Sequence, residues 1–360
     1  PSAGDFVGIK DYANTADTNN ITIARNGSNI QGTANDFTIS TEGLSIVLIY
    51  VDATQGWVST GAAKASDIAE QETFIVATGG TITTCGDYKI HTFTSPGTFC
   101  VSSIGNPVGG PNNADYLVVA GGGGGGFNGG GGGGAGGNRT SGFGPAPLQG
   151  SALPVTATAY PITVGGGGSG CAGGSGGTAG SNSIFSTITS AGGGEGGKLA
   201  TPGDAGGNGG SGGGGGTAYL SNPAGAGGSG NTPPVSPSQG NNGGAGKAPP
   251  GSPNCVLAGG GGGGVIAAGA TAGSGSGGAG GAGAPNQISG SCVSYAGGGG
   301  GGGYTTGGSG GTGGGGAGGS AGGSATAGTV NTGGGGGGTG SAPTGGAGGS
   351  GIVIIRYKYQ

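Results

Sequence analysis

The sequence predicts a mainly β protein, in which small N-terminal β modules are followed by a glycine-rich domain of stacked polyglycine-II helices bracketed by short β-strands. Three observations lead to this prediction. Glycine makes up 112 of the 360 residues and concentrates after residue 115. There it forms uninterrupted runs and a repeating Gly-Gly-X pattern, as at residues 307–312 and 345–350. Segments of β-branched and aromatic residues, typical of strands, precede and follow the glycine-rich part.

The Gly-Gly-X pattern suits a left-handed helix of the polyproline-II type. Such a helix has three residues per turn, so every third residue lies on one edge. Gly-Gly-X therefore makes a rod with two bare faces and one side-chain edge. The rod has no internal hydrogen bonds, so its amides must pair with neighbouring rods. In three of the runs we expect φ near −75° and ψ near +145°, or the mirror image that glycine allows; these runs are residues 121–126, 259–264 and 297–303.

Two other structures compete for this composition. Collagen needs glycine at strictly every third position with abundant proline, whereas here the phase slips and the 18 prolines cluster in loops. A flexible linker is the stronger alternative, because Gly/Ser-rich chains are normally random coils. The ordered lattice is favoured because the runs alternate with apolar, strand-like segments. Charged residues, which solvate disordered tracts, are also scarce.

Residues 1–62 predict an N-terminal β module used for oligomerisation and attachment. Trp57 is the only tryptophan of the chain, and we expect it to close the core of this module. A module of this size is marginally stable alone. We therefore expect it to oligomerise, with Ile46, Leu48 and Trp57 partly buried between chains. The expected strands are residues 6–12, 20–25, 36–40 and 44–52.

Residues 63–114 predict a β-meander connector that begins with one helical turn at 62–71. Its expected strands are residues 73–78, 81–85, 89–93 and 98–102. Residues 115–360 form the predicted glycine-rich domain. The apolar segments 115–120 and 352–357 bracket it, and their pairing would join its beginning to its end.

Composition and charge exclude several classes of function. The net charge is −4 and there is no basic patch, so nucleic acid is not an expected partner. No apolar stretch reaches the roughly 18 residues of a transmembrane helix, so we expect no membrane insertion. The chain begins at Pro1 and contains no methionine, which indicates a fragment or a processed product.

The sequence offers no catalytic constellation. His91 is the only histidine, and its alternating strand context predicts a buried structural residue. Phosphate loops need Gly-Lys-Ser/Thr, which does not occur. We therefore expect no enzyme activity, no cofactor and no metal site.

The five cysteines form an odd set without CxxC spacing, which disfavours zinc. Cys85 with Cys100, and Cys255 with Cys292, are candidate disulfides in an oxidising setting. Small buried thiols are the alternative.

An ordered series of motifs resembles a known group of proteins. Tyr-Lys-Ile-His-Thr-Phe-Thr-Ser-Pro-Gly-Thr-Phe at 88–99 is followed by Asp-Tyr-Leu-Val-Val-Ala at 115–120, directly before polyglycine. Together with Tyr-Pro-Ile-Thr-Val at 160–164 and the C-terminal Gly-Ile-Val-Ile-Ile-Arg-Tyr, this series resembles the glycine-rich domain of bacteriophage and environmental virion proteins. The segment at 50–57 resembles a module of cyanophage-type structural and tail-fibre proteins. A more distant likeness is to tail-fibre adhesins with a polyglycine-II sandwich.

The resemblance implies a structural protein of a virion appendage, a fibre or adhesin, exposed on the virion surface outside the cell. It implies a homotrimer or larger assembly, anchored to other virion proteins through residues 1–114. The displayed glycine-rich domain would contact a glycan or an outer-membrane protein of the host. A purely architectural subunit without a ligand is the alternative. An ice-binding protein is a remote third possibility, since some antifreeze proteins also use polyglycine-II bundles.

Aromatic residues isolated within glycine are the candidate receptor contacts. A loop aromatic beside Asn, Ser or Thr gives a large contact area with little loss of entropy. The alternative is that these side chains cover rod ends or fill gaps between chains. The candidates are Phe127, Asn128, Tyr219, Tyr295 and Tyr304.

Overall fold

The computed structural model describes residues 1–60, 72–219, 222–248, 257–342 and 344–360. These residues are strands and extended segments with one short 3-10 helix at Ala146–Leu148, which confirms the mainly β class. The chain divides into two compact units. The N-terminal unit is Pro1–Phe74 with Gly105–Pro111, and the glycine unit is Ile75–Ile104 with Asn112–Gln360. The predicted helical turn at 62–71 lies outside the described residues.

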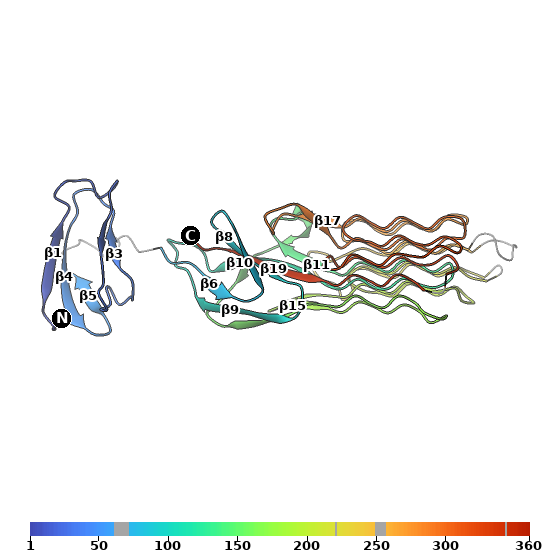
Figure 1. Ribbon diagram of the computed structural model, residues 1–360, viewed down its shortest axis with the longest axis horizontal. Coiled ribbons are helices and arrows are strands. Elements are labelled where there is room, and N and C mark those ends of the chain that lie inside the picture. Colours follow the sequence, from blue (N-terminus) through green and yellow to red (C-terminus); the bar gives the residue numbers. More distant parts are fainter. Residues whose placement is uncertain (61–71, 220–221, 249–256, 343) are drawn as a thin grey trace. The chain divides into compact units, whose positions relative to one another are not determined.

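The N-terminal unit packs a three-stranded antiparallel sheet against a two-stranded one (Figure 1). The first has the order β1 (Phe6–Lys10), β4 (Ser45–Asp52), β5 (Gly56–Ser59), and the second pairs β2 (Ile21–Ile23) with β3 (Phe37–Ile39). Ile46 and Leu48 are each 1% exposed and lie in the core between the sheets. The expectation that these two side chains are shared between chains is therefore wrong, because their own module already buries them.

The glycine unit begins with two sheets. The larger has the order β12-β11-β10-β19-β8-β7, with β13 also paired to β10, and the smaller has the order β16-β15-β14-β9-β6. Their strands are β6 (Val76–Thr78), β7 (Thr81–Cys85), β8 (Tyr88–Phe93), β9 (Gly97–Ser103), β10 (Asn113–Val119), β11 (Asn138–Ser141), β12 (Gln149–Gly150), β13 (Leu153–Pro154), β14 (Ala159–Thr163), β15 (Ser183–Phe185), β16 (Ile188–Ser190) and β19 (Ile352–Lys358). A separate hairpin pairs β17 (Ala284–Asn286) with β18 (Val293–Tyr295).

The sequence predicts a separate β-meander connector at 63–114, but the structure does not contain one. β8 pairs with β19, and β9 pairs with β14, so strands β6 to β9 belong to the glycine unit. The reason is that β8 and β9 find partners far along the chain, and β7 and β6 are attached to them as edge strands.

The predicted pairing of the two bracketing strands is confirmed. β10 runs antiparallel to β19, with Val119 opposite Ile352 and Asp115 opposite Arg356. β8 pairs with the other edge of β19, so β19 is a central strand. Its alternate side chains enter two different hydrophobic cores, one containing Ile355 and the other Ile354.

Beyond the sheets the glycine runs form threefold rods. The runs 121–126, 259–264 and 297–303 contain no helix or strand, and none of their glycines has a positive φ. Negative φ gives the left-handed sense of a polyproline-II helix. In the first run, residues three apart donate to the same neighbouring segment at 2.8–3.0 Å. The pairs, from N–H to C=O, are Gly121 to Ser181, Gly124 to Thr178, Gly122 to Gly349, Gly125 to Gly346, Gly123 to Gly134 and Gly126 to Gly131.

Each central rod is held by six neighbours. The carbonyls of the same run accept from three further segments, for example Gly121 from Gly193, Gly122 from Gly168 and Gly123 from Gly336. Three neighbouring segments accept hydrogen bonds from the run, and three others donate hydrogen bonds to it. A rod with six neighbours is packed hexagonally. All of these bonds join backbone groups, so the run 121–126 is held on six sides without side chains.

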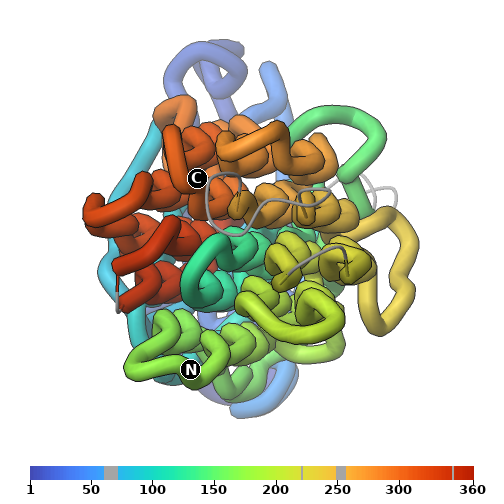
Figure 2. Tube along the Cα trace, turned by 90° about the vertical axis from the view of Figure 1, so that its right-hand side faces the viewer, coloured from blue at the N-terminus to red at the C-terminus, as the bar shows by residue number. Residues whose placement is uncertain are grey.

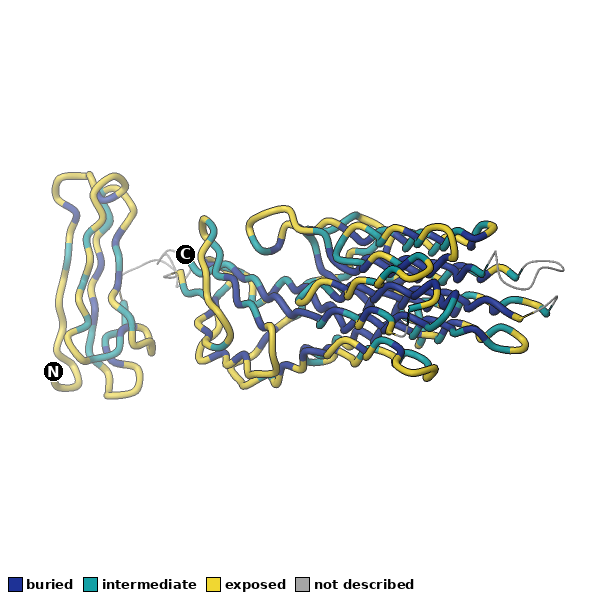
Figure 3. The backbone as a smooth tube through the Cα atoms, turned by 45° about the vertical axis from the view of Figure 1, so that its right-hand side comes forward, coloured by how far each residue is buried: buried dark blue, intermediate teal, exposed yellow. Residues whose placement is uncertain are grey.

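The X residues of peripheral Gly-Gly-X rods lie on the outside of the glycine unit, whereas Ser211, the X residue of 209–211, is fully buried. Ser309, Thr312 and Ala347 are exposed, whereas 121–126 and 130–136 are buried throughout (Figure 3). The X residue thus occupies the one position of a peripheral rod that faces solvent.

Candidate binding surface at the distal tip

The rods run between the sheets and a free end, which we call the distal tip. The run 121–126 leaves β10 and turns at 127–129, so this turn lies at the end away from the sheets. Other turns gather around it through backbone hydrogen bonds, such as Leu199 N–H to Phe127 O and Thr217 N–H to Gly129 O. Figure 2 looks onto this end of the rods. The tip comprises residues 127–129, 199–204, 217–219, 247–248, 304–306 and 340–342.

Two of the predicted contact residues are exposed at the distal tip. Tyr219 is 49% exposed and Tyr304 is 40% exposed. Their backbones are anchored, because Tyr219 N–H donates to Ala200 O and Tyr304 N–H donates to Leu257 O. Each tyrosine therefore presents an aromatic surface from a fixed point on the lattice.

Phe127 and Asn128 form the central turn of the tip and are half-buried. Asn128 has a φ of 52°, in the left-handed region that Asn tolerates better than most residues. Its N–H donates to Thr339 Oγ1 at 3.1 Å. These two residues thus shape the tip and contribute less open surface than the tyrosines.

Tyr295 does not belong to this surface. It is 4% exposed, lies in β18 and packs in the core with Leu117 and Ile288. Burial raises the pKa of its phenol. The run that follows Tyr295 starts at the sheet end, so this side chain fills the core, and the prediction of a receptor contact is wrong for Tyr295.

Two threonines support the tip, although the sequence analysis does not identify them as site residues. Thr217 and Thr339 are fully buried, and each follows directly on a glycine run. Thr217 Oγ1 donates to Lys247 O at 2.8 Å, and Thr339 Oγ1 donates to Ala342 O at 3.0 Å. A threonine that ends a glycine run is the signal that could have revealed them.

The thiols of Cys85 and Cys100 are free, so the disulfide predicted between them is absent. Cys85 ends β7 in the larger sheet and Cys100 lies on β9 in the smaller sheet, which separates them. Cys292 is also free, and Cys255 lies outside the described residues. Cys171 is buried, and burial raises the pKa of its thiol, as expected of an unreactive cysteine.

His91 is a buried structural residue, as its strand context predicted. Its Nδ1 lies 2.7 Å from Gly79 O and its Nε2 lies 3.0 Å from the Tyr357 hydroxyl. The ring stacks on Tyr357, with centroids 5.5 Å apart. A neutral imidazole satisfies both contacts by donating from Nδ1 and accepting at Nε2.

We expect His91 to make the stability of the glycine unit depend on pH. Burial lowers the pKa of His91 from its ordinary value of 6.5. Below pH 6.5 the unfolded chain binds a proton that the folded protein binds less readily, so the free energy of unfolding falls as the pH drops. The slope is at most about 1.4 kcal/mol per pH unit. Melting temperatures measured from neutral to mildly acidic pH should show this decline in the wild type and a flatter profile in His91→Gln; identical profiles would contradict it.

Other site types are not found in the described part of the chain. There, no three His, Cys, Asp or Glu side chains come together as a set of metal ligands. No helix among the same residues has the length and apolarity needed to cross a bilayer.

Residues 94–358 match the family described as a glycine-rich domain. The chain belongs to this glycine-rich domain family. The family match begins upstream of the predicted boundary at 115 and takes in β9, in keeping with the pairing of β9 to β14. No curated protein is significantly similar in sequence.

Proposed function

We propose that this glycine-rich domain protein is a structural component of a virion appendage, a fibre or adhesin, that displays a rigid body for attachment to a host surface. The observation that carries the proposal is the exposure of Tyr219 and Tyr304 at the free end of a lattice built from backbone contacts. Because the rods do not depend on their connecting loops, the loops are free to vary, as a receptor-binding surface requires. The resemblance of the motif series to virion proteins supports a place on the virion surface, outside the cell.

The proposed partners follow from the two units. Of the predicted anchor at 1–114, the N-terminal unit would hold the chain to other virion proteins and to further copies of itself, as a homotrimer or larger. The distal tip would contact a host glycan or an outer-membrane protein. Tyrosine suits both, because it combines a flat apolar ring with a hydroxyl that forms hydrogen bonds. The proposal involves no catalysis.

The tip is a better contact surface than the flanks of the bundle. The flanks present the small X residues, such as Ser309 and Ala347, which offer little area to a partner. Binding energy concentrates in large aromatic anchors. The architectural alternative needs neither of the exposed tyrosines.

Changing Tyr219 and Tyr304 together to alanine is expected to weaken surface binding at least about tenfold, since aromatic anchors commonly contribute 1–2 kcal/mol each or more. The fluorescently labelled full chain would be titrated onto a panel of cyanobacterial strains, the hosts that the cyanophage-like module suggests. Ile266→Ala is the matched control, because Ile266 is 48% exposed. It lies at the sheet end, beside the core residue Val265.

Three outcomes are informative. Loss of binding in the double variant and not in the control supports the tip. Equal binding by all variants would move the contact elsewhere on the chain. A wild-type chain that binds no strain, and whose tip variants leave infection unchanged, would favour the architectural alternative.

A further inference from the structure

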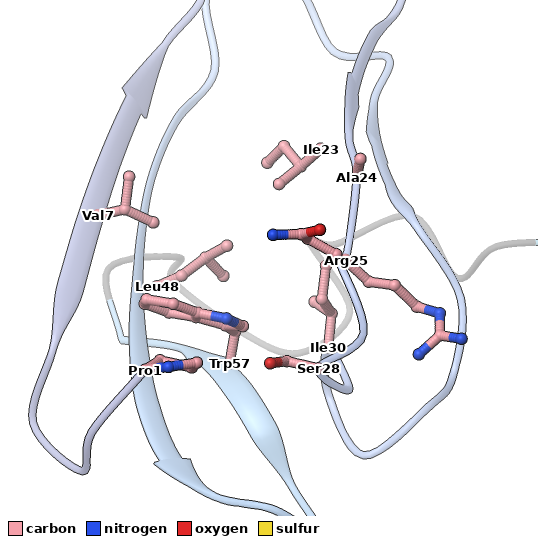
Figure 4. Close-up of a pocket in the computed structure, with 10 residues that line it drawn as sticks. Pro1, Val7, Ile23, Ala24, Arg25, Ser28, Ile30, Leu48 and Trp57 are labelled. Carbon is pink, nitrogen blue, oxygen red and sulfur yellow. The ribbon is translucent and has the colours of Figure 1, made fainter.

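The N-terminal unit contains a cleft of about 330 Å³ between its two sheets (Figure 4). Its size is at the lower end of the range for ligand pockets, roughly 300–1,000 Å³, and suits a single ring. Most of its wall is apolar. The lining residues are Pro1, Val7, Ile23, Ala24, Arg25, Asn26, Ser28, Ile30, Leu48 and Trp57.

The lining residues with hydrogen-bonding side chains are Arg25, Asn26, Ser28 and Trp57. Figure 4 shows the Trp57 indole nitrogen and the Ser28 hydroxyl directed into the gap between the sheets, while the Arg25 guanidinium points away. Neither the Trp57 nor the Ser28 side chain has a hydrogen-bond partner among the described residues. Both residues are half-buried, and neither polar atom is closed off from the surface, so both are open to an occupant. The cleft therefore suits an occupant with a flat apolar body and one polar tip.

A saccharide fits these walls poorly. A pyranose carries hydroxyls around its whole edge, and each one buried without a partner loses its hydrogen bonds to water. Half of the ten lining residues offer no such partner, since Val7, Ile23, Ala24, Ile30 and Leu48 have purely apolar side chains. A phenol has one hydroxyl and buries an apolar ring, which matches the cleft.

The same unit carries a tyrosine that is almost wholly in solvent. Tyr12 is 93% exposed, the largest exposed fraction among the exposed large hydrophobic side chains of the described chain. We propose that Tyr12 of one copy inserts into the cleft of a second copy, where its phenol oxygen accepts the Trp57 indole N–H. This inference rests on the self-association proposed above and specifies the surfaces that make it.

Tyr12 and the cleft lie on different parts of the N-terminal unit. Tyr12 lies just beyond the end of β1 at Lys10, whereas the cleft is reached by Val7 near the beginning of that strand. In a two-fold dimer each Tyr12 would fill the cleft of the other copy, and in a ring each Tyr12 would fill the cleft of the next copy. Both arrangements fill every cleft, and the measured mass distinguishes them.

Light scattering tests the proposal by measuring mass at equal concentration. The samples are the full-length wild type and its variants Tyr12→Ala and Phe6→Ala. Tyr12→Ala should be monomeric. Phe6 is 75% exposed at the start of β1, and its alanine variant should keep the wild-type mass. Tyr12→Phe, which keeps the ring and loses the hydroxyl, should assemble about 5- to 10-fold more weakly, the loss of one hydrogen bond of about 1–1.4 kcal/mol. Because Tyr12 is in solvent, none of its changes should disturb folding.

Mixing experiments identify the two halves of the contact. Ser28→Trp should block the cleft and abolish self-assembly, while its Tyr12 stays available. Mixed with Tyr12→Ala, whose cleft is open, it should form a complex of one chain of each kind. Trp57 is the only tryptophan of the natural chain, so its fluorescence in Tyr12→Ala should respond to 4-methylphenol and not to methyl glucopyranoside.

The opposite results overturn the proposal. If Tyr12→Ala keeps its mass and Phe6→Ala becomes monomeric, copies meet through the outer face of the sheet, and only the Tyr12 contact is wrong. A response of Trp57 to methyl glucopyranoside alone would make the cleft a sugar site. A monomeric wild type would remove self-association altogether, while the cell-binding test of the tip would still stand.

Discussion

Replacing Gly261 with alanine is expected to destabilise the glycine unit by about 3 kcal/mol or more, or to prevent its folding. A Cβ on Gly261 would lie 1.9 Å from Ala279 O, a backbone atom of a neighbouring rod. Gly261 also donates to Ala270 O and accepts from Gly244 N–H, so its own rod cannot move aside. Overpacking a core usually costs about 1–3 kcal/mol, and here both parties to the clash are fixed backbone.

Gly166→Ala is the matched control for this prediction. A Cβ on Gly166 meets nothing within 4 Å, and Gly166 is exposed without a positive φ. Its replacement should be neutral or stabilise by about 0.4–1 kcal/mol, since alanine restricts the unfolded chain. Thermal unfolding of both variants by calorimetry gives the comparison. Equal melting temperatures for the two would mean that the interior rods are loosely packed, against the hexagonal lattice.

The local form of the rods could be predicted from the sequence because glycine repeats leave few alternatives. Gly-Gly-X fixed the threefold period and the outward position of residues such as Ser309. The order of the rods could not be predicted. Gly122 donates to Gly349 and Gly123 donates to Gly134, although both sit in the same run with identical neighbours. Side chains that would distinguish one rod from another are missing from these runs.

The contrast between Tyr295 and Tyr304 shows where site prediction reached its limit. Both flank the run 297–303, and both have small neighbours. Burial depends on which end of the rod each one occupies, since Tyr295 lies at the sheet end and Tyr304 at the distal tip. That assignment depends on the direction of the rod, a property of the whole chain path.

Domain boundaries were also hard to predict, because they depend on pairing between strands that are far apart in the sequence. The strands of the meander were recognised by composition, and β8 and β9 lie within about two residues of their predicted bounds. Their partners, β19 and β14, lie elsewhere in the sequence, and nothing local to the meander identifies them. The N-terminal cleft escaped prediction too, since it depends on how two sheets face each other.

Ile355→Ala is expected to destabilise the glycine unit by about 2–5 kcal/mol, the usual cost of emptying a buried isoleucine site. Ile355 is fully buried and sits in β19 between Tyr116 of β10 and His91 of β8. β19 is the last strand of the chain, and it joins the beginning of the unit to its end. Loss of packing there should therefore lower the melting temperature of the whole unit.

Ile354→Ala should cost a similar amount, because β19 is buried on both faces. Ile354 is 1% exposed and packs in the other core, with Leu117 and Ile288. Ile82→Ala is the control, since Ile82 is 44% exposed on the edge strand β7 of the same sheet and should change stability by less than about 0.5 kcal/mol. Chemical denaturation of the three variants measures these costs. If Ile354→Ala were as mild as Ile82→Ala while Ile355→Ala remained severe, only one face of β19 would support the fold, and the rods would not depend on the second core.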